Sequence, residues 1–133
     1  MTRPEGWEGR LLEEIERHAG LPFIYGVSDC LLMALDCARA IDPELEFTVP
    51  AYENQDGAAR ALLKRGFRDV GEALASEFEE INPVDAHRGD LGIVTGEQLT
   101  TAVVFVGPYV VGKDHQGVLH APRSQVKRAF RVP

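Results

Sequence analysis

Cys30 is the side chain of this sequence whose position could make it reactive. It stands in PFIYGVSDCLLMALDC (residues 22–37), which predicts a loop and then a helix that begins near Ser28, a plausible N-cap. A thiol in the first turn of a helix lies beside unpaired backbone N–H groups, and these favour the thiolate. Cys30 is therefore a candidate nucleophile. A small buried apolar residue is the alternative, and position alone leaves both open.

Cys37 follows seven residues later and is predicted to be different. It lies among Leu, Ala and Met in the middle of the same helix, where nothing stabilises a thiolate, so we expect a buried core residue. Seven residues at 1.5 Å each separate the two thiols by about 10 Å, which is too far for a disulfide. The cysteines thus do not form a disulfide framework.

A nucleophilic cysteine needs a base, and the chain offers four histidines. His115 lies in the glycine-flanked loop GKDHQG, and His120 lies in the strand-like GVLHAP, where alternate side chains can face the start of the helix. His18 is predicted to be exposed on the first helix, and His87 precedes the turn RGD. For each, a solvated or hydrogen-bonded histidine is the alternative.

Other chemistries lack their sequence patterns. No Cys-x-x-Cys or His-x-x-x-His pair has the spacing of zinc ligands, and there is no phosphate-binding loop or Gly-x-Ser-x-Gly segment. We therefore expect neither a metal nor a cofactor.

The charge and hydropathy of the chain limit its partners. The formal net charge is −7, with 44% apolar and 26% charged residues, which argues against nucleic acid and anionic membranes as partners. No apolar run approaches the roughly 20 residues of a membrane span. The N-terminus is amphipathic and acidic and does not resemble a signal peptide, so we expect synthesis in a cytoplasm.

The elements that must position Cys30 fall into two halves. The 133 residues fit one domain, 1–133. Helical patterns occupy the first half, at residues 9–20, from the N-cap Ser28 through 31–41, and at 57–67 and 70–81. Short β-branched runs follow, at residues 91–95, 101–107, 109–112, 117–122 and 126–133. This order predicts an α+β fold in which N-terminal helices pack on a C-terminal antiparallel sheet.

Taken together, the segments LPFIYGVSDC, RGDLGIV, TAVVFVG and GVLHAP resemble the NlpC-type cell-wall cysteine peptidases, which have a papain-like fold. The chain is most similar in pattern to small NlpC-like proteins encoded among tail genes of tailed bacteriophages and gene-transfer agents. Those proteins share a PF-x-(Tyr/Trp)-Gly-x-x-Asp-Cys start, an Arg-Gly-Asp middle and a basic-aromatic ending like RAFRV.

The resemblance implies roles for three residues. Cys30 matches the nucleophile, His120 matches the third, orienting residue, and Asp90 matches a structural aspartate in the turn before the sheet. Thr101, however, stands where the family has its catalytic histidine, and a threonine cannot accept the thiol proton. His115 lies in a longer loop than the family's and is the substitute base that we expect, ahead of His87.

Two further departures affect the cleft. Phe23 stands where the family has a tyrosine near the oxyanion site, and Leu31 and Leu32 replace the small residues after the cysteine. The leading hypothesis is thus a structural component of a phage tail tip or hub, present in the virion and in contact with other tail-tip proteins, with a degenerate peptidase site. The alternatives are an active endopeptidase that cuts peptidoglycan peptides during DNA entry and a soluble host protein that only binds.

Overall fold

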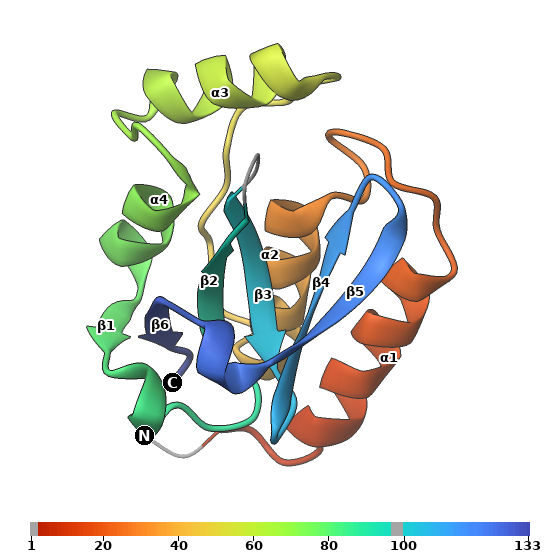
Figure 1. The fold of residues 1–133 in the computed structure, drawn as a ribbon, viewed down its shortest axis with the longest axis vertical. Coiled ribbons are helices and arrows are strands. Elements are labelled where there is room, and N and C mark those ends of the chain that lie inside the picture. Colours follow the sequence, from red (N-terminus) through yellow and green to blue (C-terminus); the bar gives the residue numbers. More distant parts are fainter. Residues whose placement is uncertain (1–2, 97–99) are drawn as a thin grey trace.

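The structure is a computed structural model that describes residues 3–96 and 100–133. Four helices come before the strands of the central sheet (Figure 1). The helices are α1 (Trp7–Ala19), α2 (Cys30–Ile41), α3 (Gln55–Lys64) and α4 (Val70–Glu77). Gly20 ends α1, as its sequence predicted.

The strands form one antiparallel sheet in the order β1-β6-β2-β3-β4-β5. They are β1 (Glu79–Ile81), β2 (Leu91–Thr95), β3 (Thr100–Phe105), β4 (Tyr109–Asp114), β5 (Gly117–Pro122) and β6 (Arg128–Arg131). The predicted α+β class and the antiparallel sheet built mainly from the second half are confirmed.

The last predicted helix was too long. Its pattern extended to Ile81, but α4 ends at Glu77 and the next residues form β1, which pairs with β6. Phe78 is buried at the junction. Pairing with a strand distant in sequence overrides the local helical preference of this short segment.

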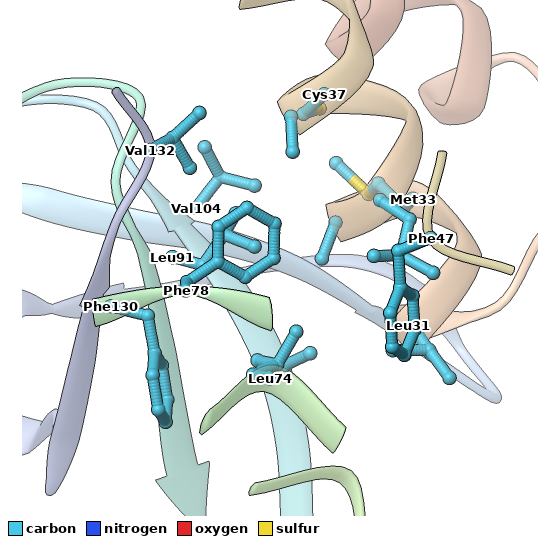
Figure 2. Close-up of a cluster of buried hydrophobic side chains, with 14 of the residues drawn as sticks. Leu31, Met33, Cys37, Phe47, Leu74, Phe78, Leu91, Val104, Phe130 and Val132 are labelled. Carbon is cyan, nitrogen blue, oxygen red and sulfur yellow. The ribbon is translucent and has the colours of Figure 1, made fainter. Parts of the chain in front are cut away.

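The main core lies between α2 and one face of the sheet. Leu35, Cys37 and Ile41 of α2 are completely buried in one cluster with Leu91 and Phe130 of the sheet. Figure 2 shows Cys37 on the helix side of this cluster and Leu91 and Phe130 on the sheet side. Cys37 is thus the core residue that the sequence predicted. The opposite face carries a smaller cluster around Val103, Phe105 and Val110.

Asp29, not Ser28, is the N-cap of α2. Its side chain accepts hydrogen bonds from the backbone N–H of Leu32 at 2.9 Å and of Gly26 at 3.0 Å. A single carboxylate therefore holds both the first turn of the helix and the loop before it, and this fixes Cys30 as the first helical residue.

Ser28 belongs instead to a buried polar network that includes His18, which was expected to be exposed. The His18 ring is completely buried and hydrogen-bonds Ser28 Oγ at 2.8 Å and Asp36 at 2.9 Å. Lys113 Nζ donates to Ser28 Oγ at 2.5 Å and to the carbonyls of His18 and Leu21. The network ties α1, the loop before α2 and β4 together.

Asp90 has the structural role that was expected of it. Its carboxylate accepts from the backbone N–H groups of His87 and Val132 and from the guanidinium of Arg3 at 3.0 Å. The buried carboxylate thereby joins the turn before β2 to both ends of the described chain.

Candidate active site

A cleft of about 230 Å³ opens at the start of α2. Its wall is mostly apolar and combines the loop before α2, the first turn of α2, the start of β3, the end of β4 and the inner side of α3. Its residues include Phe23, Tyr25, Cys30, Tyr52, Leu62 and His115. The elements converge here because the N-terminus of α2 lies at the edge of the sheet where β3 begins and β4 ends.

The Cys30 thiol is half-buried in this cleft. Burial raises its pKa from about 9 to about 11, and hydrogen bonding to the backbone amide of Ala102 opposes this only in part. The negative charge of Asp29 raises the pKa further. The backbone N–H groups of Cys30 and Leu31 at the helix start do lower this pKa, but the expected net lowering is wrong, because desolvation of the thiolate outweighs them. The thiol is protonated at neutral pH.

Ala102 is the residue of β3 whose backbone amide hydrogen-bonds Cys30. It is buried in the same core cluster, on the face of the sheet that α2 covers. Thr101 pairs with Val94, and its methyl group lies 3.4 Å from the position that a Cβ on Gly112 would take, on the opposite face. Successive side chains of a strand alternate between faces. Thr101 lines the cleft, but alternation places its side chain on the face away from Ala102, and β3 offers the thiol the backbone N–H of Ala102.

His115 is the predicted base that does reach this cleft. It lies in the turn between β4 and β5, and its ring stacks on Phe23 with centroids 4.7 Å apart. Its Nε2 is 3.1 Å from the Tyr25 hydroxyl. In the part of the chain that the structure describes, no imidazole hydrogen-bonds the Cys30 sulfur. The structure therefore brings His115 and Cys30 to one cleft without joining them.

The structure does not bring His120 to Cys30. His120 lies on β5 and pairs with Val111 of β4, and its ring is 5.6 Å from that of Tyr109. It lines a different groove, between α1 and the outer strands. The strand-like run expected at residues 109–112 is β4 (Tyr109–Asp114), and it lies in the sheet between β3 and the strand that carries His120. The orienting role expected for His120 thus finds no geometric support.

Two residues of the site were missed at the sequence level. Tyr52, in the long connection between α2 and α3, donates from its hydroxyl to Asp29 at 2.6 Å, and burial together with that carboxylate raises its pKa. No local pattern marks it. Lys113 lines the cleft from β4 and is almost completely buried. Its alternation with the buried Val111 could have revealed that it points inward.

One known family corresponds to nearly the whole chain, matching residues 2–132. The chain belongs to this family, a domain of unknown function (DUF6950). None of the curated proteins matches the chain. Because the match includes all four helices and all six strands, the cleft around Cys30 lies within the DUF6950 domain.

The DUF6950 chain shows no sign of a metal centre in the residues that the structure describes, since no three His, Cys, Asp or Glu side chains come together as ligands would. Within the same residues, no helix is long and apolar enough to cross a membrane. What the cleft does offer is a neutral thiol, an apolar wall and an imidazole held at its edge.

Proposed function

We propose that this protein is a structural component of the tail tip or hub of a tailed bacteriophage or gene-transfer agent, with an NlpC-type, papain-like fold and a degenerate peptidase site. The motifs that run from Pro22 to Cys30 and from Arg88 to Ile93 support the family resemblance. The single observation that carries the loss of catalysis is that, among the described residues, no imidazole hydrogen-bonds Cys30, to which β3 offers only the backbone amide of Ala102.

The chemical argument begins with the protonation state of the thiol. A thiol with a pKa of about 11 is ionised to about one part in 10⁴ at pH 7. A cysteine peptidase needs an imidazole both to take the thiol proton and to give it to the leaving amine. Neither Ala102 nor Thr101 can do so. The cleft therefore keeps the shape of a binding site without the groups for turnover, as an assembly protein would.

An active cell-wall endopeptidase is the second candidate, and His115 is the observation that favours it. The imidazole lines the same cleft as Cys30. To serve as the base it would have to leave its stack on Phe23 and its hydrogen bond to Tyr25. In this mechanism, closure of the β4–β5 turn over a bound peptide would bring the imidazole to the sulfur.

Purified peptidoglycan from the host separates the two candidates. We expect no released peptides from the unmodified protein, and no difference between it and the Cys30→Ala variant. Cleavage that is lost in both Cys30→Ala and His115→Ala would replace the assembly proposal with the endopeptidase. Mass spectrometry of purified particles tests the location, since a tail component must co-purify with them in constant proportion.

A further inference from the structure

The charges of this acidic protein are strongly segregated. Residues 55–68, which include α3, contain four exposed cations and a single carboxylate, Asp56, whereas the whole chain carries −7. The cations are Arg60, Lys64, Arg65 and Arg68. Such a local reversal of sign produces a positive surface that attracts an acidic partner.

Two of these cations have no partner among the described residues. Arg68 pairs with Glu72 at 2.8 Å, and Arg65 lies over the rings of Phe47 and Phe67. Arg60 and Lys64, in contrast, make neither an ion pair nor a side-chain hydrogen bond within residues 3–96 and 100–133.

An exposed leucine lies beside the unpaired cations. Leu63 is 60% exposed and follows Arg60 at the i, i+3 spacing of neighbours on a helix, and Lys64 follows Arg60 at i, i+4. We call this surface the α3 face. Free cations beside an apolar side chain suit a partner surface that combines carboxylates with an exposed apolar side chain.

The outer side of α1 has the complementary composition. Leu12 is 55% exposed and lies between Glu8 and Glu16 on one helical stripe, with Glu13 beside it. In the described part of the chain these three glutamates form no ion pair, whereas Glu14 pairs with Arg17. We call this surface the α1 face.

We propose that the α3 face of one molecule docks on the α1 face of a second copy of this chain. Each face offers one exposed leucine beside unpaired charges of a single sign, so contact would bury two apolar side chains and pair Arg60 and Lys64 with glutamates. Within one molecule α3 lies across one end and α1 along the other side, so the two faces can meet only between molecules (Figure 1).

The contact is heterologous, because different surfaces of the two copies meet. Repetition of such a contact produces a closed ring or an open chain rather than a single twofold dimer. Two short helix faces bury little area, which makes the association weak, dependent on concentration and sensitive to salt. This inference uses residues that do not line the cleft and does not depend on the proposed function.

Sedimentation equilibrium of the full chain over a concentration series tests the proposal, at about 50 mM and about 500 mM salt. We expect the mean mass to rise with concentration at low salt and the rise to weaken at high salt. Arg60→Glu/Lys64→Glu and Glu13→Lys/Glu16→Lys should each weaken association about tenfold or more, since each opposes like charges. Lys127→Glu/Arg131→Glu, which reverses two exposed cations elsewhere, should associate like the unmodified protein.

An equimolar mixture of the two weakened variants provides the decisive measurement. In the mixture every α3 face finds an α1 face of opposite charge on the other variant, so association should return. A monomer at all concentrations, or a mixture that stays monomeric while circular dichroism shows both variants folded, would overturn the proposal. Equal loss of association in the Lys127→Glu/Arg131→Glu control would do the same, because it would assign the effect to net charge.

Discussion

Cys30 and Ala102 face each other across the junction of α2 and β3. The backbone amide of Ala102 hydrogen-bonds the thiol, and its methyl group packs into the core that the start of α2 covers. The neighbouring Thr101 directs its side chain to the other side of the sheet. β3 thus offers the sulfur a backbone N–H and no basic side chain, and burial keeps the thiol protonated.

The thiol of Cys30 should react slowly and with a steep pH dependence. At pH 7 a pKa of about 11 leaves about 100-fold less thiolate than an ordinary value of about 9. Alkylation by iodoacetamide should accelerate about tenfold per pH unit through the neutral range. Cys37, with a pKa of about 12 and no exposed surface, should be slower still. Peptide mass spectrometry measures both rates. A Cys30 rate that levels off near pH 7 would contradict the raised pKa.

An imidazole at position 102 should activate the thiol, and one at position 101 should not. Ala102→His places the ring beside Cys30, whereas Thr101→His places it on the opposite face. Alkylation of Cys30 at pH 7 should rise at least tenfold in the first variant only. The larger side chain of Ala102→His in a packed site costs about 1–3 kcal/mol of stability. Thr100→His is therefore a second test, because Thr100 lies at the exposed end of β3 on the same face as Ala102. Equal activation by Thr101→His would show that the assignment of faces is wrong.

Lys113 should contribute strongly to stability. Its buried ammonium group donates to Ser28 and to the carbonyls of His18 and Leu21. Lys113→Met removes all three of these charge-assisted hydrogen bonds, and we expect a loss of about 2–4 kcal/mol in the free energy of unfolding. Urea denaturation measures it. The exposed Lys127→Met should change stability by less than about 0.5 kcal/mol, and similar values for both would contradict the role of the network.

Asp36 should make stability dependent on acid pH. Burial alone would raise the pKa of Asp36, but the hydrogen bond to His18 and the charges of His18, Arg17 and Arg39 together lower it. A carboxylate with a lowered folded-state pKa stabilises the protein above its ordinary pKa, and this contribution disappears as pH falls through the lower value.

Asp36→Asn should therefore flatten the loss of stability below about pH 4, as measured by urea denaturation at several pH values. Asp56→Asn is the matched control, because Asp56 is exposed and has no ion pair in the described residues. If Asp36→Asn loses stability below about pH 4 as steeply as the unmodified protein, the ion pairs around Asp36 do not contribute to the pH dependence of stability.

The sequence by itself determined the class and order of the fold. The 3.6-residue pattern of α1 and α2, the stop at Gly20 and the alternating β-branched runs after Gly89 are local signals, because side-chain periodicity follows directly from backbone geometry. The buried state of Cys37 followed from the same reasoning, since its neighbours on the helix are apolar.

Only the tertiary structure decided which side chains meet Cys30. The phase of β3 places Ala102 rather than Thr101 at the thiol, and a shift of one residue in a strand exchanges its two faces, which motif comparison does not resolve. The separate strand β4 places His120 in another groove. His18 became buried because residues distant in sequence supplied its partners. The pKa of Cys30 also depends on how deeply the tertiary structure buries the thiol, which no local pattern encodes. This burial raises the pKa by more than the backbone N–H groups at the helix start lower it.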